Sequence, residues 1–201
     1  MPRFVPLLLG LVASGTFALT GPARLCAAEP LSPLDLRVKT WAEQCAAEIV
    51  GQYDLLLTAG RLTVPQLFDT LYTPVPGTDP QKYRTQYDTL SDGVIRPILD
   101  KYLAFDKNLV FVVAVDRNGY LPSHNSRYSQ PLTGDGDHDT KWNRTKRLFN
   151  DRTGLAAARN KEPFLLQRYN RDTGETMADM SVPILVQGRH WGALRIGYKV
   201  P

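Results

Sequence analysis

Two histidines are the first candidates for metal or proton chemistry in this sequence. Of its three histidines, His124 and His190 are the two expected to lie on β-strands. An imidazole can bind a metal or a b-type haem, and a pair of imidazoles can respond to pH near neutrality. The alternative is that each ring only bonds a neighbouring backbone group. We favour this alternative and expect no metal and no cofactor.

An acidic segment has the alternating carboxylates of a calcium-binding loop, in the order Asp135-Gly-Asp-His-Asp139. The rest of that pattern fails. Thr140 stands where the loop needs glycine, and Lys146 stands where it needs a bidentate glutamate. The segment therefore predicts a flexible acidic loop.

Motifs for catalysis are scarce. The sequence contains no G-x-S-x-G, Walker or HExxH motif and no supported pair of catalytic carboxylates. Asp172-Thr-Gly174 echoes the aspartic protease triplet, but it occurs once and fits a hairpin turn. The glycines of Gly188-Arg-His-Trp-Gly192 fit a turn and close packing beside Trp191. We expect no enzyme; the catalytic alternative is a small exported hydrolase that uses His124 or His190.

Basic side chains gather between residues 144 and 159. An arginine can hold a carboxylate through two parallel charge-assisted hydrogen bonds, so this stretch is a candidate for anion recognition. The same residues could instead form a solvated helical face or pair with Asp151 and Glu162. They are Arg144, Lys146, Arg147, Arg152 and Arg159.

The first element that must position these groups is a long helix. Apolar residues recur at three-to-four spacing from Leu34 to Leu56, which predicts an amphipathic helix over residues 34–57. Cys45 lies on its apolar stripe, and this position predicts a buried, inert thiol.

Further helices are expected before the strands. Thr63 predicts the capped start of a short helix, and the prolines of residues 73–80 predict a loop. A third helix is expected over residues 81–104, where Gly93 and Pro97 should kink it or split it.

The second half of the chain predicts strands around a loop-rich insert. Leu109 to Val115 is an apolar run, and Asn118-Gly119 suits a tight hairpin because both residues tolerate a positive φ. The insert covers residues 126–163, with short helices expected at 143–150 and 154–159. Strands follow at 164–169, 175–186 and 190–199.

The expected fold class is α+β. Two hairpin strands and the three later strands would form a five-stranded, mainly antiparallel sheet. A long N-terminal helix would lie against it, and helices and loops would cover one face. We divide the mature chain into a helical arm, residues 29–106, and a sheet with its insert, residues 107–201.

The N-terminus has the features of a secretory signal. Arg3 supplies a positive end, an apolar stretch follows, and Cys26-Ala27-Ala28 resembles a cleavage site before Glu29. Residues 1–28 are therefore expected to be a signal peptide. The alternative is an uncleaved anchor over residues 4–21, which is just long enough to approach the bilayer thickness.

Composition limits the partners. The chain has 201 residues, 24 Lys and Arg, and 20 Asp and Glu. Two of the bases, Arg3 and Arg24, precede Glu29, so the mature chain keeps 22 bases against 20 acids. This small excess argues against nucleic acid as a partner. Without Cys26 the mature chain has one cysteine, Cys45, and no internal disulfide.

Five blocks in one order carry a resemblance to a known family. The chain resembles, over residues 80–201, the extracytoplasmic PAS-like (Cache-type) sensor domain of bacterial methyl-accepting chemotaxis proteins. The blocks are Lys82-Tyr-Arg-Thr-Gln-Tyr87, Asp116-Arg-Asn-Gly-Tyr-Leu-Pro-Ser-His-Asn125, Tyr128-Ser-Gln-Pro131, Asn143-Arg-Thr-Lys-Arg-Leu-Phe-Asn-Asp-Arg-Thr-Gly-Leu155 and Gly188-Arg-His-Trp-Gly192.

Two departures from that family matter. Such receptors continue into a second transmembrane helix, a HAMP module and a methyl-accepting coiled coil, whereas this chain ends at Pro201. We therefore expect a stand-alone exported chain whose output half is missing or supplied by another protein. Some sensors of this type carry covalent haem on Cys-x-x-Cys-His, which is absent here, so no c-type haem is expected.

The resemblance implies a ligand pocket between the sheet and the segments that cover it. Such a pocket is mostly apolar with a few convergent polar groups. The residues expected to line it are Tyr120, His124, Arg127, Tyr128, Trp142, Arg147 and His190.

The resemblance also implies the function. We expect a periplasmic sensory domain that binds a small molecule and signals to a membrane receptor or signalling protein, with a homodimer formed through the N-terminal helix. The alternative class is a haem- or metal-binding redox or gas sensor without the c-type motif.

Overall fold

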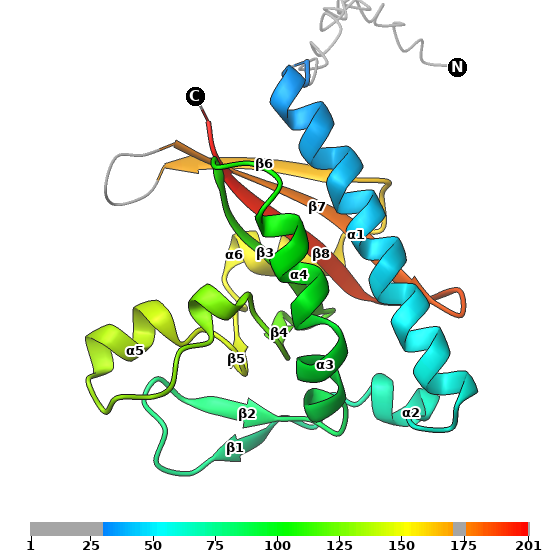
Figure 1. Cartoon of the computed structure of the whole chain (residues 1–201), viewed down its shortest axis with the longest axis vertical. Coiled ribbons are helices and arrows are strands. Elements are labelled where there is room, and N and C mark those ends of the chain that lie inside the picture. Colours follow the sequence, from blue (N-terminus) through cyan, green and yellow to red (C-terminus); the bar gives the residue numbers. More distant parts are fainter. Residues whose placement is uncertain (1–29, 171–175, 201) are drawn as a thin grey trace, which may run out of the picture. The chain divides into compact units, whose positions relative to one another are not determined.

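An antiparallel sheet forms the centre of the fold. The computed structural model describes residues 30–170 and 176–200. Within them the main sheet has the strand order β3 (Leu109–Asp116), β8 (Arg189–Lys199), β7 (Thr176–Val186) and β6 (Leu165–Asn170) (Figure 1). The three C-terminal strands are therefore confirmed. The expected turn at residues 172–174 lies outside the described residues, as does the expected signal peptide of residues 1–28.

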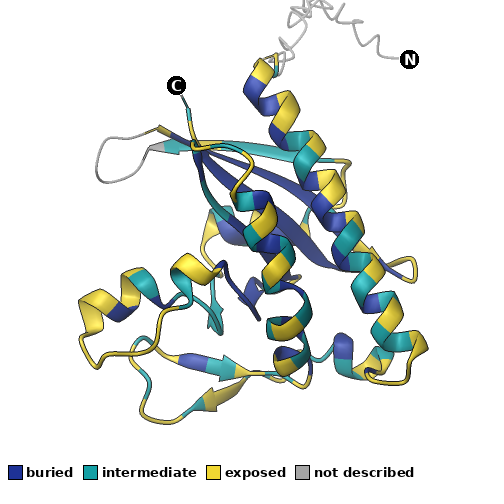
Figure 2. Ribbon diagram, in the orientation of Figure 1, coloured by how far each residue is buried: buried dark blue, intermediate teal, exposed yellow. Residues whose placement is uncertain are grey.

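One face of the sheet is covered by the long helix α1 (Pro33–Thr58), which confirms the predicted helix. A capping box begins it: Ser32 Oγ accepts from the Asp35 amide, and the Asp35 carboxylate accepts from the Ser32 amide. Figure 2 shows a dark buried stripe along α1, which packs on β7 and β8. The largest side chains of that stripe are Leu34, Val38, Ile49 and Tyr53.

Cys45 belongs to the same stripe and has no exposed surface. Burial, with a smaller contribution from the Glu48 charge, raises the pKa of its thiol far above the usual value. A thiol that stays protonated and out of reach of solvent is a poor nucleophile. The predicted burial of Cys45 is therefore confirmed, and its lack of reactivity stays a prediction.

The segment between α1 and the sheet departs from the sequence prediction. Thr63 caps a short helix, α2 (Val64–Leu67), as expected. The expected loop and the start of the third helix instead form a small hairpin of β1 (Thr73–Val75) and β2 (Lys82–Arg84). The buried Lys82 ammonium explains the difference, because it donates to the carbonyls of Asn143 and Thr145 and ties the segment to the insert.

The remainder of that third region is split into two helices, as Gly93 and Pro97 predict. The first is α3 (Asp88–Val94), and the second is α4 (Arg96–Leu103). Pro97 lies in the first turn of α4, where its missing amide costs no intrahelical hydrogen bond. Helix α4 packs beside β3. The arm expected to be helical thus also contains a β-hairpin.

The main sheet has four strands among the described residues, whereas the sequence predicted five. The second arm of the central hairpin, β4 (Tyr120–Leu121), pairs with β5 (Arg147–Leu148) in a separate small sheet. A single bridge, from Ala114 to Ser123, joins this arm to β3. Pro122 accounts for the departure, because it has no amide to donate to a longer ladder.

The turn between β3 and β4 is held by the Asp116 carboxylate, which accepts hydrogen bonds from the amides of Asn118 and Tyr120. Gly119 adopts a positive φ of 81° and Asn118 does not, so the expectation for Asn118 was wrong. A Cβ at Gly119 would also overlap the Phe149 carbonyl, which explains why the turn requires glycine at this position.

Part of the insert covers the second face of the sheet. It contains the one-turn helix η1 (Ser126–Tyr128), α5 (Gly136–Trp142) and α6 (Arg152–Arg159). Helix α6 packs through Ala158 against the cluster that contains Val113, Val115 and Ala193. Both faces of the sheet are therefore covered, which fits the uninterrupted apolar run of β3.

Two predictions for the insert were wrong. The helix expected at residues 143–150 is replaced by β5 and irregular chain. The segment expected to be a flexible acidic loop is the start of α5, capped by Asp135. Asp139 is buried and accepts from the amides of Thr133 and Gly134, so this carboxylate fixes the local fold.

The β7–β8 turn is a tight one. Gln187 and Gly188 both adopt a positive φ, 49° and 72°, as a two-residue hairpin turn requires. The expected close packing beside Trp191 is present as well, since a Cβ at Gly192 would overlap the Val115 carbonyl.

Among the described residues, no helix is both long and apolar enough to cross a membrane.

Candidate functional site

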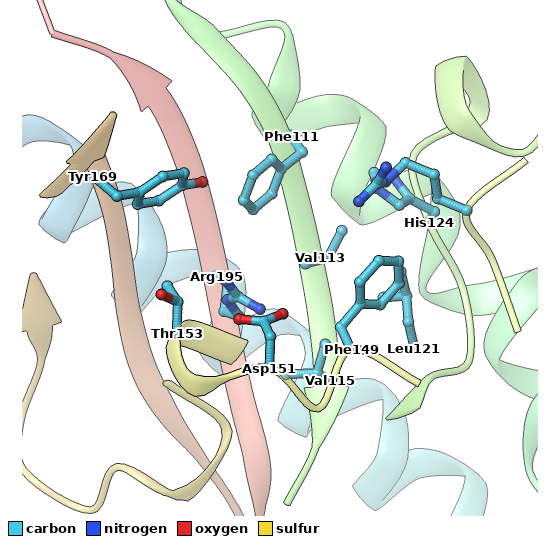
Figure 3. A pocket seen from close by; sticks show the side chains of 11 residues that line it. Phe111, Val113, Val115, Leu121, His124, Phe149, Asp151, Thr153, Tyr169 and Arg195 are labelled. Atoms are coloured by element: carbon cyan, nitrogen blue, oxygen red, sulfur yellow. The ribbon is translucent and has the colours of Figure 1, made fainter. Parts of the chain in front are cut away.

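A cavity opens on the second face of the sheet. Along β3, side chains alternate between the two faces: Val112 and Ala114 join the core under α1, while Phe111, Val113 and Val115 point the other way. This second set forms one wall of a cavity of about 290 Å³. Figure 3 shows these side chains pointing into a common space with others from β8, β6 and the insert.

The cavity has an apolar wall and a polar floor and rim. Leu121 and Phe149 extend the apolar wall that β3 begins. Phe111 lies flat over β8, with its ring where a Cβ of Gly197 would be. The glycine therefore makes room for the ring. The polar lining residues are His124, Arg144, Asp151, Thr153, Tyr169 and Arg195.

Arg195 forms the floor of the cavity together with Asp179. The guanidinium donates from Nε and Nη2 to the Asp179 carboxylate on the neighbouring strand β7. Burial is the largest single effect and would lower the pKa of Arg195, but the charge of Asp179 and its hydrogen bonds, with smaller contributions from other groups, together raise it. Both partners are buried, so the charge of the arginine is neutralised inside the protein.

His124 is the unusual polar group of the lining. It is only 3% exposed, and its Nδ1 has no hydrogen-bond partner. Burial, with the charges of Arg144 and Arg96 adding to it, lowers the pKa of His124 to about 3. The imidazole is therefore neutral near pH 7 and keeps a hydrogen-bonding nitrogen that the protein leaves unused.

Two arginines pack on one ring at the same end of the cavity. The guanidinium carbons of Arg144 and Arg147 lie 4.9 and 5.2 Å from the centroid of Phe149. The backbone positions Arg144, whose amide donates to the Tyr128 carbonyl. The pKa of Arg147 is lowered, first by burial and then by repulsion from Arg144. Two guanidinium groups therefore lie together at this end of the cavity.

Asp151, Thr153 and Tyr169 add further polar groups to the lining. Asp151 caps α6, since its Oδ1 accepts from the Gly154 amide at 2.9 Å. Thr153 and Tyr169 line the cavity on the same side, and Figure 3 shows the Asp151 carboxylate beside the Arg195 guanidinium. The Asp151 carboxylate is thus already hydrogen-bonded within the protein.

Of the seven residues expected to line a pocket, His124 lies in the cavity wall. Two others stand behind it: the Tyr128 ring lies 4.9 Å from the His124 ring, and Trp142 stacks on Tyr128 at 5.9 Å. Arg147 does not line the cavity, but its guanidinium packs on the ring of Phe149, which does. One of the seven predicted residues therefore lines the cavity, and the other three named here lie near it without lining it.

The other three predicted residues lie elsewhere. Tyr120 is fully buried, and its hydroxyl donates to the Asp88 carboxylate and the Tyr83 carbonyl, so its place is in the core. Arg127 is exposed. His190 stands at the start of β8, with Nε2 3.1 Å from the Asn160 carbonyl oxygen.

The positions of His124 and His190 are relevant to the alternative function, a haem- or metal-binding sensor. The described residues contain no group of three or more His, Cys, Asp or Glu side chains placed to hold a metal ion. His124 faces the cavity alone, while His190 contacts backbone, as the simpler interpretation of that histidine predicted. Within the described chain, the site offers a single imidazole in an apolar wall.

Most lining residues were missed by sequence reasoning. One signal could have found part of the wall: an apolar run with no polar alternation, Leu109 to Val115, indicates a strand covered on both faces. Its odd-numbered residues then had to face something other than the long helix. The contributions of Asp151, Tyr169 and Arg195 had no comparable signal, because their proximity arises from strand order and from the path of the insert.

Comparisons with known proteins give distant likenesses. No protein-family profile and no curated protein matches the chain. Among solved structures, an extracellular ligand-binding receptor from Desulfohalobium retbaense has a TM-score of 0.37 and 13% identity, over 81% of this chain and 25% of that one. The ligand-binding domain of the Pseudomonas aeruginosa amino acid chemoreceptor PctC, in complex with GABA, has a TM-score of 0.35 and 15% identity, over 82% of this chain and 60% of that one.

Proposed function

We propose that this chain is an exported sensory domain that binds a small organic molecule in the cavity over β3 and β8. The observation that carries the proposal is the cavity itself, a space of about 290 Å³ with an apolar wall, several polar groups and the buried imidazole of His124 in its lining. Small-ligand sites combine an apolar lining with a few polar groups that fix orientation. Binding rather than catalysis is proposed, since the sequence has no recognised catalytic motif and the low pKa of His124 makes its imidazole a weak base.

A route from the cavity to α1 supports a sensory role. The Asp35 carboxylate, in the first turn of α1, accepts from Arg168 Nη2 at 2.6 Å and from the Tyr198 hydroxyl. Arg168 precedes Tyr169, which lines the cavity, and Tyr198 lies on the strand that carries Arg195. A ligand that favours one position of β6 and β8 would thereby bias α1, provided that its affinity differs between the two arrangements.

The output belongs to the same proposal. The signal passes from α1 to a membrane protein that the chain meets on its periplasmic side, or it passes between the two copies of a homodimer formed through this helix. Leu36 and Leu55 on α1 are more than half exposed, so two apolar side chains of this helix remain uncovered. Light scattering of the purified protein tests the dimer, and a monomer at all concentrations would contradict this part.

Ligand binding is tested by thermal unfolding of the purified protein with a panel of organic acids, amino acids and amines. A ligand at a hundred times its Kd stabilises the folded state by about 2.7 kcal/mol through linkage. The variant V113F fills the cavity and should lose the shift. The variant L185F, on an exposed position of β7, should keep it. A folded protein that no compound of the panel stabilises would contradict the proposal.

A further inference from the structure

The guanidinium of Arg195 has one nitrogen that its ion pair does not use. Nε and Nη2 donate to the Asp179 carboxylate on the neighbouring strand. Among the described residues, Nη1 has no hydrogen-bond partner, and it is not one of the side-chain atoms that are both enclosed and unpartnered. The Arg195 side chain is 10% exposed and lines the cavity. Nη1 is therefore a hydrogen-bond donor that the cavity can use.

The Asp151 carboxylate also keeps an oxygen for the cavity. Oδ1 accepts from the Gly154 amide and caps α6. Oδ2 has no hydrogen-bond partner in the part of the chain that the structure describes. Asp151 is an exposed residue of the lining, so Oδ2 is accessible. A carboxylate oxygen only accepts hydrogen bonds. The helix cap thus fixes the position of an acceptor at the edge of the cavity.

The donor and the acceptor lie close together without bonding to each other. Figure 3 shows the Asp151 carboxylate beside the Arg195 guanidinium. Burial would lower the pKa of Arg195, and the Asp151 charge is one of the smaller contributions that raise it, after that of Asp179. Within the described chain, however, no hydrogen bond joins Asp151 to Arg195. A group that bridges them must accept from Nη1 and donate to Oδ2.

Charge distinguishes the ligand groups that could form this bridge. A carboxylate would accept from Arg195 but would be repelled by Asp151, and an ammonium would donate to Asp151 but would be repelled by Arg195. A carboxamide accepts through its oxygen and donates through its nitrogen, and it carries no charge. The neutral amide is therefore the group that both residues favour.

The rest of the lining describes the body of the ligand. Val113 and Val115 belong to an apolar wall, and the ring of Phe111 adds an aromatic surface. We propose that the cavity recognises an uncharged organic amide with a compact apolar body, its amide group between Arg195 and Asp151 and its body against β3. This inference rests on the proposed function and adds the head group and the charge of the ligand.

Three probes that share one ring test the charge. Benzamide, benzoate and benzylamine have a neutral, a negative and a positive head group near pH 7. Each is titrated into the isotope-labelled protein, and amide chemical shifts are followed, which detects millimolar binding. We expect benzamide to shift the amides of Val113, Asp151 and Arg195. It should bind about tenfold more tightly than either charged probe, since each of those keeps one favourable contact and gains one repulsion.

The variant D151N tests the acceptor. Asparagine caps helices about as well as aspartate, so its oxygen can replace Oδ1 at the Gly154 amide, and its nitrogen then offers the cavity a donor. Benzamide should lose affinity and benzoate should gain it, so that the ratio of their affinities falls about tenfold or more. Arg195 is left unchanged in this test, because without it Asp179 would be buried unpaired.

The matched control is D137N, which makes the same exchange at an exposed aspartate in the first turn of α5, outside the cavity. It should leave the ratio of the benzamide and benzoate affinities unchanged. An amide spectrum with native dispersion shows that each variant is folded.

The outcomes separate the inference from the proposed function. Tighter binding of benzoate or benzylamine at the cavity amides would overturn the amide assignment and leave a ligand-binding cavity in place. A ratio that folded D151N does not change would overturn it too, as would cavity amides that respond to none of the three probes. The thermal panel and V113F decide the proposed function separately, since a compound that stabilises the protein but not V113F would support it in each of these cases.

Discussion

Arg195 and Asp179 form a buried ion pair across the neighbouring strands β8 and β7, directly beneath the candidate ligand cavity. In the β7–β8 register Arg195 is opposite Ser181 and Asp179 is opposite Gly197, so the two charged residues are diagonal neighbours on one face. The pair brings a cation into the cavity floor without giving the floor a net charge.

Loss of the Asp179 carboxylate should therefore strongly lower the free energy of unfolding. In D179N the Arg195 charge stays buried without its partner, and breaking a buried pair in this way costs about 3–5 kcal/mol. E43Q breaks the exposed pair between Lys39 and Glu43 on α1, which should cost less than about 1 kcal/mol. Urea unfolding measures both, and equal costs would contradict the importance given to the buried pair.

Because His124 is buried in its neutral form, the free energy of unfolding should fall in acid. Its pKa is lowered to about 3 in the folded protein, from 6.5, so the unfolded chain takes up a proton at a higher pH than the native one does. The contribution to stability is complete above pH 6.5 and is lost as the pH falls toward 3, by about 1.4 kcal/mol for each pH unit.

The variant H124F should remove that slope between pH 6.5 and about pH 5, where carboxylates remain ionised. H138Q, at a largely exposed histidine of α5, should keep it. Denaturant unfolding at several pH values gives the comparison. An unchanged slope in H124F would mean that His124 is not buried in neutral form.

Gly192 should tolerate no side chain. A Cβ at this position would overlap the Val115 carbonyl of the neighbouring strand, so G192A must push β3 and β8 apart. We expect a loss of more than about 2 kcal/mol, or failure to fold. At Gly51, in the middle of α1, a Cβ meets no atom within 4 Å, and G51A should stabilise the protein by about 0.5–1 kcal/mol. Thermal unfolding distinguishes the two.

Cys45 should resist modification in the native state. Its side chain is fully buried and burial raises the pKa of its thiol, so little thiolate is present and no reagent reaches it. In a C26S background, a thiol reagent should react only as fast as the protein unfolds, and denaturant should make the reaction complete. Rapid labelling without unfolding would show that α1 separates from the sheet.

Local pattern was enough to predict several parts of the fold. The apolar repeat of residues 34–57, the cap at Thr63 and the split near Pro97 could be predicted because each depends on residues close in sequence. The strands after residue 164 belong to the same group. The conversion of residues 73–84 into a hairpin could not be predicted, since it depends on Lys82 reaching carbonyls of Asn143 and Thr145, some 60 residues away.

The candidate site, like the fold, has parts that could be predicted from the sequence and parts that could not. His124 was identified from residue type alone, because an imidazole near the end of an apolar strand is a candidate in any fold. The sequence by itself also determined that β3 is apolar on both faces. Tertiary structure alone decided that β4 would pair with β5, that Asp179 would neutralise Arg195, and that Arg144 and Phe149 would line the cavity with His124. These arrangements depend on strand order and on the path of the insert, which bring together residues that no local spacing relates.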